Sequence, residues 1–151
     1  MNLILYYLFV YLIEAIILWL YCNRIFTSRK NTFLSLLITI GMFSLLIPVA
    51  ILTNAALNAF CSFIVYLCCI VLNYDSKPVW ALFHALALTI LMALSEGLIA
   101  AAIPDITIYA FRDGNIHSSA FTFVILSKSV YLCISQLSLI HISEPTRRVV
   151  I

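Results

Sequence analysis

The chain has 151 residues, of which 65% are hydrophobic and only 9% are charged, and its mean hydropathy is +1.16. A soluble domain of this size covers itself with charged side chains, so this composition excludes one and indicates that lipid surrounds the chain. The net charge of +2 is too small to indicate a nucleic-acid partner. We therefore expect an all-α, polytopic transmembrane bundle of about five spanning helices, with the lipid bilayer as its main partner.

The first predicted span covers residues 3–22. It lacks the basic start and the small-residue cleavage site of a signal peptide, and Glu14 interrupts its apolar run, so we expect this helix to be retained. A loop over residues 23–31 follows. It carries the largest basic cluster of the loops, namely Arg24, Arg29 and Lys30.

The second predicted span covers residues 32–52. Pro48 lies inside it and lacks a backbone N–H, so it should kink the helix near its far end. A polar turn over residues 53–58 leads to the third predicted span, residues 58–73, whose start could also include residues 55–57.

A short turn over residues 74–78 precedes the fourth predicted span, residues 79–103. Pro78 suits the first turn of that helix, since its missing N–H would have no intrahelical acceptor there. Pro104 closes the helix.

The fifth predicted span, residues 120–136, follows a loop over residues 105–119. Residues 106–111 of this loop are apolar and aromatic enough to lie at the membrane interface. Aromatic side chains also gather near the helix ends, where interfacial belts explain them: Tyr6, Tyr7, Tyr21, Tyr74 and Trp80.

The orientation follows from the basic residues, because short loops rich in lysine and arginine face the cytoplasm. Arg24, Arg29 and Lys30 therefore predict a cytoplasmic first loop in the cell (plasma) membrane. The N-terminus is then outside, as are the 53–58 turn and the 105–119 loop.

Residues 137–147 read LSLIHISEPTR. This string resembles the translation of a transposon-type sequencing adaptor. The resemblance predicts a membrane bundle over residues 1–136, cut from a longer parent, and a non-native tail over residues 137–151.

Six polar side chains inside the apolar segments are the candidate coupling residues: Glu14, His84, Ser95, Glu96, Ser127 and Lys128. A charge near the bilayer centre costs roughly 2.5–3.5 kcal/mol on insertion scales, so such residues face the bundle interior and find partners. Lys128 can pair with Glu14 or with Glu96, and either choice leaves one carboxylate over. The charges could simply join the helices, form a polar cluster that shifts between two bundle states or receives a ligand, or line a proton or ion path.

A metal pair between His84 and Glu96 is not expected. The two residues are twelve positions apart, which places them about 120° apart around a helix. We expect His84 to be a hydrogen-bonded packing or interface residue.

The sequence contains no P-loop, G-x-S-x-G or H-E-x-x-H motif, so we predict no enzyme activity, no metal and no cofactor for this chain. Its five cysteines have no zinc-type spacing and are interpreted as small packing residues: Cys22, Cys61, Cys68, Cys69 and Cys133. Cys22, at a membrane boundary, is the candidate for S-acylation or redox sensing.

Three segments carry a family resemblance: YLIEAIILWLYCNRIF followed by SRK, ALFHALALTILMALSEGLI, and FTFVILSKSVYLCISQ. They resemble the N-terminal membrane sensor region of GHKL-type sensor histidine kinases of Firmicutes, a group that includes Agr-type peptide-pheromone receptors. The likeness covers residues 1–136 and lies in the order and spacing of four positions: Glu14, Phe83-His84, Ser95-Glu96 and Ser127-Lys128.

The resemblance implies a receptor for quorum sensing and two-component signalling. In such proteins the bundle binds an extracellular signal, often a peptide, and the homodimeric parent passes a phosphate from a kinase histidine to a response regulator. The dimerisation helices, the phospho-accepting histidine and the ATP-binding domain are absent from this chain, so His84 is not that histidine.

Two other interpretations stay open. Intramembrane carboxylates and a Pro-interrupted helix also suit a small transporter or channel fragment. A membrane assembly or immunity-type protein without signal transduction would need no further domain.

Overall fold

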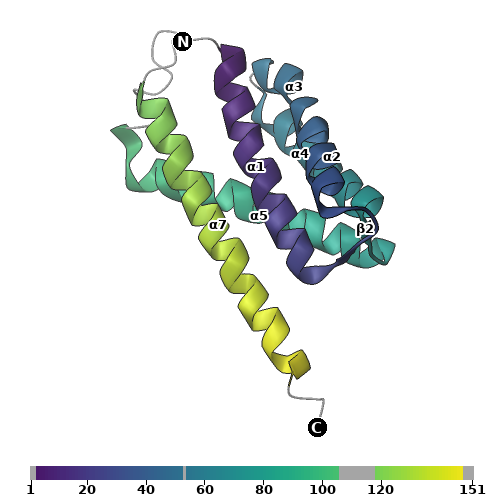
Figure 1. Ribbon diagram of the computed structural model, residues 1–151. Helices are drawn as coiled ribbons and strands as arrows, with labels where there is room; N and C mark the ends of the chain where they lie inside the picture. The colour runs from purple at the N-terminus through teal and green to yellow at the C-terminus, as the bar shows by residue number, and fades with distance from the viewer. Residues whose placement is uncertain (1–2, 53, 106–117, 148–151) are drawn as a thin grey trace.

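The computed structural model describes residues 3–52, 54–105 and 118–147, and for residues 118 and 138–147 it describes the backbone alone. In this part of the chain five helical segments are long and apolar enough to cross a membrane. The predicted all-α, polytopic bundle is therefore confirmed (Figure 1). Residues 106–117, which include the predicted interfacial stretch 106–111 and most of the 105–119 loop, lie outside the described residues.

Helix α1, Leu3–Ile25, is three residues longer than predicted at its C-terminal end. Its 23 residues span about 34 Å at 1.5 Å per residue, enough for the hydrocarbon core. Arg24 lies in its last turn, where a cation favours the helix dipole. Apolar side chains surround α1, as expected for a helix with protein on one side and lipid on the other.

The second span is broken, as Pro48 predicts. Helix α2, Thr32–Ser44, is followed by helix α3, Ile47–Ile51, with Pro48 in the first turn of α3. Between them, the backbone N–H groups of Leu45 and Leu46 donate to carbonyls three residues back, at 3.3 and 3.0 Å. A tighter turn therefore replaces the α-helical hydrogen bonds that cannot continue through a proline.

Helix α4, Ala55–Asn73, begins three residues before residue 58, where the sequence predicts the start of the third span. Asn54 caps it, since its side-chain oxygen accepts a hydrogen bond of 3.0 Å from the backbone N–H of Leu57. Such a cap satisfies one of the free donors of the first turn. The structure thereby decides between the two starts that the sequence had left open.

A short antiparallel pairing at one end of the bundle was not predicted. Strand β1, Thr27–Ser28, pairs with strand β2, Tyr74–Asp75, and the Arg29 N–H donates to the Asn73 carbonyl at 2.9 Å. The loop after α1 and the turn after α4 therefore meet on the same side. We call this region the β1–β2 end.

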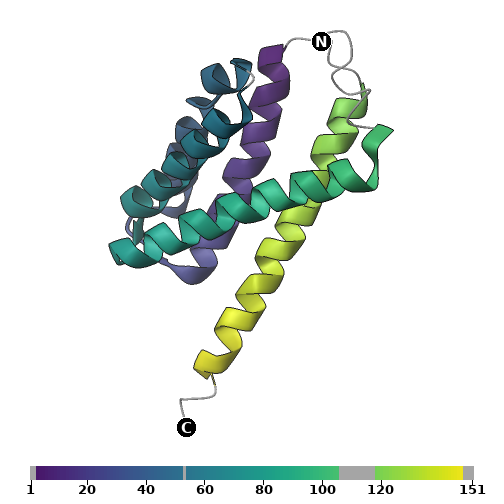
Figure 2. The same cartoon turned by 180° about the vertical axis from the view of Figure 1, so that it is seen from behind.

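Helix α5, Pro78–Ala102, crosses the other helices obliquely (Figures 1 and 2). It packs against α4 and against α7, Ser118–Arg147. Helices α1, α4 and α7 are parallel in chain direction: each begins at the end of the bundle opposite the β1–β2 end (Figure 1). The apolar span within α7, Ser119–Leu137, agrees with the prediction to one residue at each end, but the helix itself continues to Arg147.

The core contains large, fully buried aromatic side chains from three helices and β2: Phe43, Tyr66, Tyr74 and Tyr131. Large apolar side chains also cover the outside of the bundle, where Phe33, Leu45 and Val79 are among the most exposed. In water such a surface would favour association, whereas lipid solvates it. The molecule is thus a multi-pass membrane protein.

Candidate functional site

The centre of the site is an ion pair shared by three helices. The Lys128 amine on α7 donates to Oε1 of Glu14 on α1 and, at 2.5 Å, to Oε1 of Glu96 on α5. The sequence offered these two pairings as alternatives, and the structure contains both. We call Glu14, Lys128 and Glu96 the charge triad.

The fold explains why these residues meet. Glu14 lies at the middle of α1 and Lys128 at the middle of the Ser119–Leu137 span. Glu96 lies in the second half of α5, but the oblique path of α5 carries it against α7 (Figure 2). The three charges therefore come to one place from different positions along their helices.

The triad has more negative than positive charge. With both carboxylates ionised and Lys128 protonated, its sum is −1. The side chains of Lys128 and Glu14 are only 2% and 3% exposed, whereas that of Glu96 is 40% exposed. The second oxygen of Glu14, Oε2, is buried and accepts no hydrogen bond. An unsatisfied carboxylate oxygen in a medium of low dielectric constant is costly, so the site favours a positive partner or a hydrogen-bond donor there.

A pocket of about 260 Å³ lies beside the triad. Its polar lining includes Glu14, Glu96 and Lys128, and near the start of α1 it includes Tyr6 and Tyr7. The pocket therefore extends from the middle of the bundle toward the end opposite the β1–β2 end.

Two further lining residues fix the shape of the pocket. The Tyr11 hydroxyl donates to the Asn58 side-chain oxygen at 2.8 Å and joins α1 to the first turns of α4. Neither residue was a predicted site residue. Asn58 was predicted to lie in a turn, and nothing in the spacing of Tyr11 indicates that it faces a pocket.

The interfacial-belt interpretation of the tyrosines is wrong for three of them. Tyr6, Tyr21 and Tyr74 are each at most 3% exposed and face the protein interior. Trp80 is exposed, as a belt residue should be. Position near a helix end does not determine whether a ring points toward the protein interior or toward the outside.

Ser95 and Ser127 are buried, but neither hydrogen-bonds to the triad. Their hydroxyls donate within their own helices, to Met92 O at 2.7 Å and to Val124 O at 3.2 Å. Ser127 lines the pocket. Small hydroxyl side chains allow close helix packing in membranes, and α5 packs against α7.

His84 lies apart from the triad, at the β1–β2 end of the bundle. Its Nδ1 and the Tyr21 hydroxyl share a hydrogen bond of 2.8 Å, and its ring packs on Phe26, Trp80 and Phe83. The structure therefore places His84 in a hydrogen-bonded aromatic cage. Among the described residues there is no group of His, Cys, Asp and Glu that could hold a metal ion.

The predicted topology residues lie at the same end. Arg24, Arg29 and Lys30 belong to α1 and the loop after it, and Lys77 comes from the turn after β2. Arg29 pairs with Asp75 at 3.2 Å. This end therefore carries an excess of positive charge.

Tyr74 anchors the β1–β2 end from within. Its hydroxyl accepts a hydrogen bond from Ser35 Oγ and donates one to Asn23 Oδ1, both at 3.3 Å. Burial raises the pKa of Tyr74 to about 12, against a smaller opposing effect of the Ser35 hydrogen bond. The residue is therefore neutral and structural.

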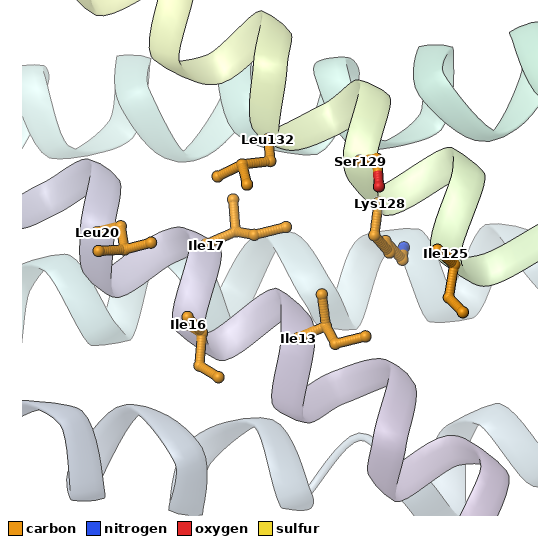
Figure 3. A pocket seen from close by; sticks show the side chains of 8 residues that line it. All are labelled: Ile13, Ile16, Ile17, Leu20, Ile125, Lys128, Ser129 and Leu132. Atoms are coloured by element: carbon orange, nitrogen blue, oxygen red, sulfur yellow. The ribbon is translucent and has the colours of Figure 1, made fainter.

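The triad lysine also borders an apolar groove between α1 and α7, of about 300 Å³ (Figure 3). Figure 3 shows the lining side chains: Ile13, Ile16, Ile17, Leu20, Ile125, Lys128, Ser129 and Leu132. The aliphatic stem of Lys128 contributes to this wall while its amine bonds the carboxylates. Because Ile16 and Ile125 are exposed, the groove faces the lipid.

The cysteine thiols are free. Cys22, the candidate for acylation, is fully buried within the bundle. An acyltransferase could not reach it in this fold, and packing explains it better.

The fold and the placement of charge define a multi-pass helical membrane protein with a polar site in its interior. No family model matches the chain, and the searches of curated proteins and of solved structures returned no significant match.

Proposed function

We propose that this chain is the membrane-embedded, signal-sensing bundle of a two-component sensor histidine kinase. The observation that carries the proposal is the charge triad, in which one buried lysine bonds carboxylates from two other helices beneath a pocket. Its support from the sequence is the resemblance to GHKL-type sensors at Glu14, Glu96 and Lys128. In this proposal the kinase domain belongs to a longer parent, which passes its phosphate to a separate response regulator, and the adaptor-like string at residues 137–147 marks the proposed cut.

A shared lysine suits a two-state element. A ligand can shift a conformational equilibrium only by binding one state better than the other. A ligand that engages Glu14 or Glu96 competes with Lys128 for that carboxylate, and Lys128 then strengthens its pairing with the other one. Because the two carboxylates lie on α1 and α5, such an exchange moves one helix relative to the other.

The proposed orientation places the basic β1–β2 end in the cytoplasm of a cell whose plasma membrane holds the bundle. Four basic residues and one acidic residue gather there: Arg24, Arg29, Lys30, Lys77 and Asp75. Basic loops of this kind stay on the cytoplasmic side. The N-terminus and the pocket then face outward, toward an extracellular peptide signal.

Long-read sequencing of the locus across the codon for Gln136 tests whether the chain comes from a longer kinase and whether its tail is adaptor-derived. A frame that continues into a GHKL ATP-binding domain supports the proposal. A natural frame that reads ISEPTRRVVI and stops overturns it.

The role of the triad is tested in the full-length parent, reconstituted with its response regulator. Lys128→Met and Glu96→Gln should change the signal dependence of autophosphorylation, with Cys133→Ser as an exposed control on α7. An unchanged signal response at normal expression contradicts the proposed coupling.

A transporter or channel fragment is the second candidate, favoured by the break between α2 and α3 at Pro48 and by the buried carboxylates. Ion flux into liposomes that contain the purified chain, abolished by Glu14→Gln, would favour this candidate over the sensor.

A further inference from the structure

The pocket beside the charge triad is lined by two carboxyl groups and one amine, those of Glu14, Glu96 and Lys128. Lys128 bonds one oxygen of each carboxylate, and Glu14 Oε2 remains buried without a hydrogen-bond donor. Glu14, Glu96 and Lys128 line the pocket, so with both carboxylates ionised and Lys128 protonated the sum of charge at the pocket floor is −1. A bound cation with N–H donors would supply both the missing charge and the missing hydrogen bond.

The walls of the pocket are aromatic. Tyr6, Tyr7 and Tyr11 from α1 line one side, and Phe123 from α7 lines another. The faces of aromatic rings attract cations, and the attraction grows where water is excluded. Carboxylates and aromatic rings that line the same pocket are typical surroundings of an organic ammonium group.

The size of the pocket excludes a bare ion as a good fit. Its volume of about 260 Å³ equals that of eight or nine waters at about 30 Å³ each. Direct ligands for an inorganic ion would have to surround it closely. A short aliphatic chain with a terminal amine fills the same space and keeps its carbon atoms against Val10, Met92 and Val124.

We infer that this pocket binds a primary ammonium group, either of a small alkylamine or of a peptide through a lysine side chain or its N-terminus. The ammonium would donate to Glu14 Oε2 and approach the partly exposed carboxylate of Glu96. This inference deepens the proposed function, because it names the ligand chemistry of the same site. It does not need the kinase, and its test uses binding alone.

The test titrates the purified 151-residue chain in lipid nanodiscs at neutral pH by calorimetry, with empty nanodiscs as the blank. The probes are n-butylammonium chloride, the neutral butyramide and the anionic butyrate, which are similar in size. We expect saturable binding of one butylammonium per chain. Butyramide and butyrate should bind at least tenfold more weakly. Equal binding of the three probes would overturn the inference.

Three variants locate the site. Glu14→Gln should weaken butylammonium binding at least tenfold and Glu96→Gln at least threefold, since each removes one carboxylate while Lys128 keeps the other. Asp75→Asn, at the exposed β1–β2 end, is the matched control and should bind as the natural chain does. If both triad variants bind butylammonium like the natural chain, the ligand is elsewhere and the inference is wrong.

Two further titrations, with a lysine peptide and with sodium, distinguish a peptide ligand, a small amine and an inorganic cation. A Gly-Lys-Gly amide that binds more tightly than butylammonium assigns a peptide ligand, and the reverse order assigns a small amine. Sodium that binds saturably and excludes butylammonium would instead define an inorganic cation site and overturn the inference. Failure here leaves the kinase test intact, and a failed kinase test does not alter the binding result.

Discussion

The two polar regions of the bundle differ in how their charged and hydrogen-bonding side chains are paired. At the β1–β2 end, the His84 ring hydrogen-bonds to Tyr21, the Tyr74 hydroxyl bonds to two side chains, and Arg29 pairs with Asp75. In the charge triad one lysine serves two carboxylates, and a buried oxygen is left over.

The difference separates a structural region from one that can change partners. The unpaired buried side-chain atoms of the β1–β2 end, Asn73 Oδ1 and Ser76 Oγ, are uncharged, whereas the unpaired atom of the triad is a carboxylate oxygen, which a cationic ligand can satisfy. Substitutions in the two regions test whether Glu14 and Glu96 can replace each other as partners of Lys128, and whether each contact at the β1–β2 end acts on its own.

The largest expected effect follows from Lys128→Met, because it removes the only cation of the triad and leaves two carboxylates close together. Loss of one partner of a buried ion pair costs about 3–5 kcal/mol. The free energy of unfolding in mixed micelles, followed by circular dichroism, should fall by that order. Adding Glu14→Gln and Glu96→Gln to Lys128→Met should restore most of it. A triple variant as unstable as Lys128→Met alone would show that lost packing, not charge, is the cause.

The next effect concerns the two carboxylates and depends on their sharing of Lys128. Glu14→Gln and Glu96→Gln should each cost only about 1 kcal/mol, because Lys128 keeps one charged partner. The double variant leaves a buried lysine without a charged partner and should cost about 3–4 kcal/mol, more than the sum of the single changes. The same unfolding measurement gives the coupling energy. Additive effects would mean that Lys128 does not need either partner.

A smaller effect is expected at the β1–β2 end from Tyr21→Phe, which removes the hydroxyl that bonds His84 and keeps the ring. Hydrogen bonds between membrane helices contribute about 0.6 kcal/mol on average, so a loss of that order is expected. Tyr66→Phe is a matched control within the core, because its hydroxyl makes only long contacts, of 3.4 Å, with Met92 and Tyr131. Equal effects of the two changes would contradict a specific contribution of the Tyr21–His84 hydrogen bond to the free energy of unfolding.

The sequence predicted where residues lie along their helices better than it predicted which side of each helix faces the protein interior. Glu14 and Lys128 were expected near mid-membrane, and Pro48 was expected to interrupt the second span, because residue counts and a missing N–H determine both. Tyr6 and Tyr21 were assigned to the interface when they face the interior. A helix that is apolar all around gives no pattern from which its buried face can be inferred.

The parts that sequence could not predict depend on tertiary geometry. Glu96 joins Lys128 and Glu14 only because α5 crosses obliquely, and no periodicity within α5 encodes that crossing. The pairing of β1 with β2 involves two residues in each strand, too few for an alternating pattern. The pocket is likewise a product of packing, since Tyr11 and Asn58 are 47 positions apart.

The smallest expected effect comes from Asp75→Asn, which breaks the ion pair with Arg29 at the β1–β2 end. The two side chains are 74% and 50% exposed, so solvent and salt screen their attraction. Exposed pairs of this kind contribute about 0–1 kcal/mol, and the loss should shrink further as salt is raised from low to physiological concentration. The backbone pairing of β1 with β2 should survive, as judged by slow hydrogen exchange of the Arg29 N–H, which donates to Asn73 O. A loss as large as that of Lys128→Met, or rapid exchange at Arg29, would mean that this surface pair organises the end of the bundle, and the contrast with the triad would fail.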